Sequence, residues 1–339
     1  MSGALVILVL IVAAGLAFDY INGFHDAANA VATVVSTGVL PLRTAVLMAA
    51  VLNFVGALTG TEVARTIGED LIKPDEITQV VVLSALVAAI FWNLSTWYLG
   101  LPSSSSHAMV GGMIGASMAH AGTRSIHGEG VFKVVESLVI SPIIGLFLGF
   151  AAMLAIYWLC RRVHPSKLDR VFRKLQIASS AVMALSHGSN DAQKTMGIIA
   201  MALAIHAGNS GARRGDFEVP TWVIAACALA MAAGTMTGGK RIIKTMGKKI
   251  IDLHPVQGFA AETASAATIL TASHLGLPVS TTHVVSGSIM GVGASRRVSA
   301  VRWGVAARIA WAWVLTIPIA AAVSWTCYHP MARALAALD

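Results

Sequence analysis

Two nearly identical segments interrupt apolar sequence at positions 176 residues apart. Residues 99–107 read Leu-Gly-Leu-Pro-Ser-Ser-Ser-Ser-His, and residues 275–283 read Leu-Gly-Leu-Pro-Val-Ser-Thr-Thr-His. Each combines glycine and proline, which punctuate helices, with a run of hydroxyl side chains. A match at a fixed spacing indicates duplication of a structural unit. Any fold of this chain must therefore accommodate two equivalent breaks within apolar helices.

Charged residues are missing from long stretches on either side of these breaks. Residues 4–16, 140–159 and 314–324 hold none, and only 12% of the 339 residues are charged, against about 25% in an ordinary soluble domain. With their flanks, several such stretches reach the roughly 20 apolar residues that cross a bilayer. A soluble helix would also need a polar face. We predict an all-α polytopic membrane protein.

Other classes of protein fit the sequence poorly. The N-terminus lacks the basic start of a secretory signal, so we expect it to form the first span. Cys160, Cys227 and Cys327 lie in or beside different apolar stretches, which predicts neither disulfides nor a zinc site, and we expect no cofactor. The net charge of +8 resides largely in short loops, where it sets membrane orientation and does not indicate nucleic acid.

Two further matches extend the duplication. Residues 23–27 (Gly-Phe-His-Asp-Ala) match residues 188–192 (Gly-Ser-Asn-Asp-Ala), and Gly-x-x-Thr-Gly occurs at both 56–60 and 234–238. All three matches follow the same order along the chain. We predict a first transmembrane repeat over residues 1–137, a connecting span and basic cytoplasmic loop over 138–176, a second transmembrane repeat over 177–300 and a terminal span over 301–339.

The charges of the loops predict that the two repeats have inverted topology. Residues 161–174 hold six Lys or Arg against one Asp, and residues 240–249 hold five with no acid, so both should be cytoplasmic. The loop matching the latter, residues 62–76, has two basic and five acidic residues. We expect it on the opposite side, with both termini outside. About ten to twelve passes follow, including broken helices that form re-entrant hairpins.

The hydroxyl-rich segments are candidate anion sites. Pro102 and Pro278 suit the first turn of a helix, so we expect a new helix to begin at each. Free N–H groups at a helix start, together with hydroxyls, bind anions, and two such starts can hold one oxyanion between inverted repeats. Alternatively these side chains only cap or bridge helices; their duplication favours the site. The candidate donors are Ser104, Ser105, Ser106, Ser280, Thr281 and Thr282.

Buried carboxylates are the candidate coupling groups. Asp26 and Asp191 occupy matching positions in apolar sequence, where an ionisable group indicates function. We expect the preceding glycines to interrupt the helices and free carbonyl oxygens for a small cation or proton. Asn29 should share the helix face of Asp26, while Asp19 and Glu262 are further candidates. The alternative role for these residues is a structural ion pair.

These motifs resemble the inorganic phosphate transporter family, particularly its short bacterial low-affinity members. The resemblance rests on Gly-x-x-Asp-Ala-x-Asn at residues 23–29, His-Gly-Ser-Asn-Asp-Ala-Gln-Lys at residues 187–194, and the two Leu-Gly-Leu-Pro segments. It covers almost the whole chain and implies phosphate symport through an inverted-repeat fold in the bacterial inner membrane. It also implies that the hydroxyl segments bind substrate and that Asp26, Asn29, Asn190 and Asp191 are conserved polar positions.

Two positions depart from the pattern of many relatives. His25 and Lys194 stand where those relatives have Asn, and Lys194 aligns with Asn29 across the repeat. An ammonium there would fill the space of a cation or pair with the substrate. This favours protons over sodium, with phosphate carried alone or as a neutral metal–hydrogen phosphate. His25, His107, His187 and His283 are candidate titrating groups, although His107 and His283 suit helix ends equally well.

We therefore predict a secondary active importer of inorganic phosphate, coupled to a cation and not an enzyme. A sulfate transporter, sodium-coupled phosphate symport and a channel are the alternatives. An intramembrane hydrolase is disfavoured because both halves carry the Ser-rich segment and neither has a Gly-x-Ser-x-Gly elbow. The expected partners are phosphate, the cation and the lipid bilayer. The sequence leaves open the metal requirement and the oligomeric state, a homo-oligomer included.

Overall fold

The computed structural model describes residues 3–67, 77–126, 128–208, 218–277 and 279–337, which are helical apart from short connections. Residues 68–76, most of the acidic loop predicted over residues 62–76, lie outside these ranges. The first helices are α1 (Gly3–Ser36), α2 (Leu42–Ala57), α3 (Glu62–Ile67), α4 (Gln79–Leu99), α5 (Ser105–Ala121) and α6 (Gly128–Cys160). The later ones are α7 (Pro165–His206), α8 (Thr221–Thr237), α9 (Lys240–Lys244) with the π-helical turn η3 (Thr245–Lys249), α10 (Pro255–His274), α11 (Thr281–Arg296) and α12 (Trp303–Ala336).

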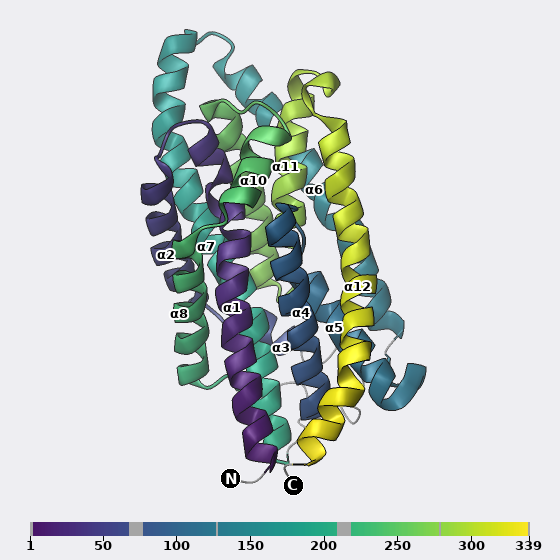
Figure 1. The fold of residues 1–339 in the computed structure, drawn as a ribbon. Helices are drawn as coiled ribbons and strands as arrows, with labels where there is room; N and C mark the ends of the chain where they lie inside the picture. Colours follow the sequence, from purple (N-terminus) through teal and green to yellow (C-terminus); the bar gives the residue numbers. More distant parts are fainter. Residues whose placement is uncertain (1–2, 68–76, 127, 209–217, 278, 338–339) are drawn as a thin grey trace.

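The longest helices run side by side along one axis, with the start of α1 and the end of α12 at the same end of the molecule (Figure 1). Four described segments are long and apolar enough to cross a membrane, namely α1, α4, residues Leu138–Cys160 of α6, and α12. Helix α8 with residues Lys240–Lys249, bent by 61°, qualifies as a fifth. Large apolar side chains such as Phe147 and Trp311 are 65% exposed, as lipid contact requires. The all-α membrane architecture is confirmed, and the count of ten to twelve passes stays a prediction.

Both Leu-Gly-Leu-Pro segments break the helical path, as predicted. Helix α4 ends at Gly100 (φ 68°) and α5 begins at Ser105, while Gly276 (φ 67°) follows α10. Positive φ at these two positions favours glycine. Pro102, however, lies ahead of the N-cap residue Ser104 and not in the first helical turn. The side chain of Ser104 fixes the helix start because its hydroxyl accepts a hydrogen bond from the backbone N–H of His107, a donor of the first turn without a partner inside the helix. Pro278 is outside the described residues.

The glycines before the two central aspartates do not interrupt their helices, which corrects our expectation. Helices α1 and α7 run unbroken through Gly23 and Gly188. A Cβ on Gly23 would lie 2.3 Å from the backbone oxygen of Met231 in α8, and one on Gly188 2.2 Å from that of Asn53 in α2. These glycines therefore permit close helix packing and free no carbonyl oxygens.

Helices that are far apart in the sequence pack closely against each other. Helix α6 packs along α11, and α5 packs along α12. At the first contact a Cβ on Gly145 would lie 2.3 Å from the oxygen of Val284, and one on Gly291 2.0 Å from that of Leu146. Close backbone approach between small residues is how membrane helices associate without a hydrophobic driving force. The two contacts correspond to each other across the predicted duplication.

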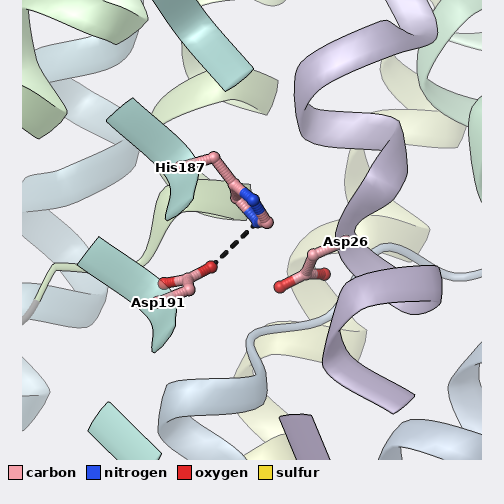
Figure 2. A group of neighbouring side chains, drawn as sticks. All are labelled: Asp26, His187 and Asp191. Carbon is pink, nitrogen blue, oxygen red and sulfur yellow. Dashed lines mark ion pairs between the residues drawn. The ribbon is translucent and has the colours of Figure 1, made fainter. Parts of the chain in front are cut away.

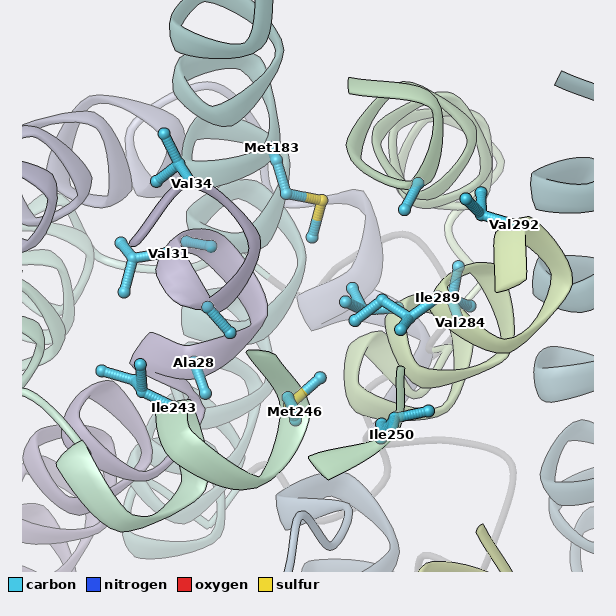
Figure 3. Packing of buried hydrophobic residues seen from close by; sticks show 14 of the residues in the cluster. Ala28, Val31, Val34, Met183, Ile243, Met246, Ile250, Val284, Ile289 and Val292 are labelled. Atoms are coloured by element: carbon cyan, nitrogen blue, oxygen red, sulfur yellow. The ribbon is translucent and has the colours of Figure 1, made fainter. Parts of the chain in front are cut away.

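The largest buried apolar cluster joins these elements around one end of α1 (Figure 3). Val31 of α1 and Met183 of α7 belong to it, together with Met246 of η3 and Ile289 of α11. Such interdigitated packing leaves little room for displacement of single side chains. The cluster therefore packs α1 against α7, η3 and α11 in this conformation. Helices α6 and α7 run without a break across positions 137/138 and 176/177, two of the boundaries proposed from the sequence.

Candidate functional site

Two buried carboxylates face each other at the centre of the molecule. Asp26 projects from α1, and Asp191 projects from α7 beside His187, one turn earlier on the same helix (Figure 2). One ligand atom from each of these three side chains lies within 4.8 Å of the others. The carboxylates are only 3% and 2% exposed. Such a pair requires compensating donors or cations, because charge is costly away from water.

Asp26 is surrounded by donors from both Leu-Gly-Leu-Pro segments. His25 Nδ1 lies 2.7 Å from Asp26 Oδ1. Ser105 Oγ donates to Oδ2 at 3.3 Å, and Thr282 Oγ1 donates to Oδ1 at 3.3 Å. The other nitrogen of His25 lies 3.0 Å from Thr96 Oγ1 in α4. This carboxylate thus bridges the starts of α5 and α11.

Asp191 has a different and more cationic set of partners. Lys194, three residues later on α7, donates from Nζ to Asp191 Oδ1. His187 Nε2 lies 3.0 Å from Oδ2, and Thr281 Oγ1 donates to the same oxygen at 2.9 Å. The ammonium of Lys194 also donates to Ser106 Oγ at 2.6 Å and to the backbone oxygen of Val279 at 3.0 Å.

Some hydroxyls of the two Leu-Gly-Leu-Pro segments cap helices, and the others contact side chains around Asp26 and Asp191. Ser104 and Ser280 each accept a hydrogen bond, at 3.3 Å, from the backbone N–H three residues later, so these two act as N-caps. The remaining predicted hydroxyls contact the carboxylates, Lys194 or Asn29. Asn29 Nδ2 donates to Thr281 Oγ1 at 3.3 Å and to Thr282 Oγ1 at 3.0 Å. Helix capping therefore accounts for Ser104 and Ser280, and a substrate role for the other four hydroxyls stays a prediction.

The contacts of the two halves correspond. Ser105 with Asp26 has its counterpart in Thr281 with Asp191. Across the halves, Asn29 with Thr282 has its counterpart in Lys194 with Ser106. Asn29 and Thr282, which are 253 positions apart in sequence, are thereby placed around one centre. This arrangement offers neutral donors, one ammonium and two carboxylate acceptors within a small volume.

Three predicted site residues have hydrogen-bond partners away from the Asp26–Asp191 pair. Asn190 Nδ2 donates to Ser273 Oγ at 3.0 Å, in α10. Asp19 accepts a hydrogen bond from Thr195 on α7. Glu262 of α10 accepts three, from Gln176 Nε2 at 3.2 Å and from the hydroxyls of Thr33 and Ser179. The last two are further buried carboxylates with their own hydrogen-bond partners.

The two matching histidines form a ring stack beside the centre. The rings of His107 and His283 lie 4.9 Å apart, and His283 packs on Trp313 of α12 at 4.1 Å. Trp313 Nε1 donates to the backbone oxygen of Pro102 at 2.9 Å. This stack fixes the start of both broken helices against α12. Sequence reasoning missed Trp313 and Thr96, whose only signal is a polar or indole group within an apolar helix.

Several known proteins with similar sequences are described as phosphate transporters. The model of the phosphate transporter family matches residues 22–324. A probable low-affinity inorganic phosphate transporter of Rhizobium meliloti is 50% identical over 323 residues, which cover 95% of this chain and 96% of the relative. A protein of the same description from Bacillus subtilis is 49% identical over 326 residues, covering 96% and 97%.

A solved structure gives the same result for the fold. It is described as the sodium-dependent phosphate transporter and is 28% identical to this chain. Its TM-score is 0.84, with 95% of this chain and 98% of the solved chain covered.

Proposed function

This chain belongs to the phosphate transporter family, and on that premise we propose that it imports inorganic phosphate as a secondary active symporter. The observation that carries the proposal is the convergence of Ser105, Thr281 and Thr282 on one buried pair of carboxylates, with Ser106 on the ammonium of Lys194 beside them. Hydroxyls and an amide bind an oxyanion without fixing it by many full charges, so the anion can also be released.

The mixture of donors and acceptors suits hydrogen phosphate. Its P–O oxygens would accept from the hydroxyls and from Asn29. Its P–OH group would donate to Asp26 or Asp191. Sulfate has no such proton at neutral pH and would be repelled by an ionised carboxylate. The acceptors therefore favour phosphate over sulfate.

We propose that protons provide the coupling, through Asp26 and Asp191, with His25, Asp19 and Glu262 as further candidates. Lys194 already supplies one positive charge beside Asp191, so this carboxylate does not need a metal cation to balance its charge. The similarity to a sodium-dependent transporter supports the alternative, sodium-coupled phosphate symport. A neutral metal–hydrogen phosphate is a second form of substrate that the same donors would accept.

Alternating access in this proposal comes from movement of one repeat against the other. The corresponding contacts of α5 with α12 and α6 with α11 support a duplicated architecture. The proposal also includes inverted repeats, a location in the bacterial inner membrane and external termini. The start of α1 and the end of α12 lie at the same end of the molecule (Figure 1), which is consistent with termini on one side of the membrane. Substrate and ion would then reach the carboxylate pair from each side in turn.

The test is uptake of labelled phosphate by proteoliposomes that contain the purified protein. A pH gradient is imposed alone, then a sodium gradient alone, with sulfate as competitor and with magnesium present or absent. The proposal predicts accumulation driven by the pH gradient and insensitive to sulfate. Accumulation driven only by the sodium gradient would show that sodium, and not the proton, is the coupling ion. Absence of uptake under both gradients would refute phosphate symport.

A further inference from the structure

The ammonium of Lys194 is enclosed by oxygen atoms. The residue is only 3% exposed and lies in the middle of α7. Its three hydrogen bonds end on the Asp191 carboxylate, the Ser106 hydroxyl and the Val279 carbonyl. An ammonium has three N–H donors, so these contacts use all of them. The three acceptors come from three separate segments of the chain.

These acceptors are the groups that also bind small inorganic cations. Carboxylate, hydroxyl and carbonyl oxygens are the ligands that hard cations prefer in proteins. A lysine in such a cage satisfies the oxygens as a metal ion would, while remaining covalently attached. It donates directed hydrogen bonds in place of metal–oxygen bonds.

The matching position of the first half contains no such cation. Asn29 occupies it, and its neutral amide donates to Thr282, the counterpart of Ser106. Asp26 receives its hydrogen bonds from His25, Ser105 and Thr282. The two halves thus surround equivalent carboxylates with the same hydroxyl framework, and only the second half adds a fixed positive charge.

We propose that Lys194 is a tethered cation that permanently fills a monovalent-cation site formed by Asp191, Ser106 and the Val279 carbonyl. The proposal rests on the transport function proposed above and makes Lys194 a residue that determines cation specificity. It implies that this half of the centre takes no free sodium. Replacement of Lys194 by asparagine, the residue of the first half, opens the site to a free ion.

The decisive measurement is the thermal stability of purified protein in detergent, titrated with sodium chloride against choline chloride at constant ionic strength and without phosphate. Ligands that bind only the folded state raise its unfolding temperature in a saturable manner. We expect no sodium-specific rise for the natural sequence and a saturable rise of several degrees for Lys194→Asn. The matched control is Lys167→Asn, an exposed lysine at the start of the same helix, which should behave like the natural sequence.

A double variant locates the ion. Adding Asp191→Asn to Lys194→Asn removes the carboxylate, and the sodium response should disappear. A folded Lys194→Asn protein without any sodium response would overturn the proposal. If that variant does not fold, Lys194→Gln takes its place. A saturable sodium response in the natural sequence that is lost in Asp191→Asn would also overturn it, because the site would then be open despite the lysine.

Failure of this proposal and failure of phosphate transport are separable. The stability titration contains no phosphate and no membrane gradient, so it reports cation binding alone. Natural protein that transports phosphate, combined with a sodium-insensitive Lys194→Asn variant, would leave the transport function intact and refute the tethered cation. A Lys194→Asn variant that is stabilised by sodium, combined with a natural protein that transports no phosphate, would support the tethered cation and refute the transport function.

Discussion

Thr282 Oγ1 donates to Asp26 Oδ1 at 3.3 Å and so joins the start of α11 to the middle of α1. Donor and acceptor belong to opposite halves of the chain. Lys194 of α7 donates to Ser106 in the first turn of α5 at 2.6 Å, and this contact also joins the two halves. Both contacts must change if one half moves against the other. The centre that we propose as the substrate site is therefore also the place where movement of one half against the other would change the hydrogen bonds.

Replacing Asp26 by asparagine should abolish concentrative uptake. The substitution keeps the size of the side chain and removes its charge and one acceptor for His25, Ser105 and Thr282. Hydrogen bonds to a charged group contribute about 1.5–3 kcal/mol each, so we expect uptake to fall by about tenfold or more. Initial rates in proteoliposomes measure the effect. Asp252→Asn, at an exposed ion pair with Arg302, should retain full activity; equal accumulation by Asp26→Asn would remove that residue from coupling.

Replacing Thr281 by valine should weaken phosphate binding. Valine has nearly the same shape but lacks the hydroxyl that contacts Asp191 and Asn29. Loss of a hydrogen bond of about 1–1.5 kcal/mol predicts a rise in KM of about tenfold. Uptake at a series of phosphate concentrations would show it. The matched control, Thr326→Val, lies on an exposed face of α12, and an unchanged KM for Thr281→Val would exclude this hydroxyl from the substrate site.

Replacing Gly291 by valine should destabilise the protein. The new Cβ would lie 2.0 Å from the backbone oxygen of Leu146, where no flexible side chain can yield. Overpacking of this kind costs about 3 kcal/mol, which lowers the unfolding temperature by roughly 6–12 °C. Gly304→Ala is the control, because nothing lies within 4 Å of its Cβ position. Equal melting curves for the two variants would show that α6 and α11 are less closely packed than described.

Replacing Glu262 by glutamine separates folding from transport. The hydroxyls of Thr33 and Ser179 can rotate to accept from the new amide, so the unfolding temperature should change by only a few degrees. If Glu262 assists coupling, uptake falls about tenfold while the fold is retained. Parallel melting and uptake curves measure both effects. Full uptake by this variant would assign Glu262 a purely structural role.

Much of the centre was predictable because the duplication marks it. Ser105, Thr281, Asp26 and Asp191 occur at matching positions, and a matched polar pair in apolar sequence has few structural explanations. The breaks at Gly100 and Gly276 followed from the same comparison. Sequence could place these residues together because each repeat supplied an internal alignment of the other.

The errors arise where the outcome depends on neighbours across the bundle. Gly23 and Gly188 were expected to break their helices, but glycine in a membrane helix serves equally for close packing, and only the adjacent backbones of α8 and α2 decide between the two. Similarly, the partners of Glu262 come from α1 and α7. No spacing within α10 reveals them. Local pattern identifies a polar residue in an apolar helix but not the helix that it faces.

The contact between α5 and α12 has a consequence for biosynthesis. Gly111 and Gly115 of α5 fit against the backbones of Ile317 and Ala321, which leave the ribosome about 200 residues later. Until then, only the face of α5 that packs on α4 can be covered by its described partner, since the face that meets α12 has none yet. The packing around both broken helices can therefore be completed only after α12 has been synthesised, because Trp313 of α12 contacts His283 and the backbone oxygen of Pro102. A nascent chain that stops short of α12 lacks this support for both halves at once.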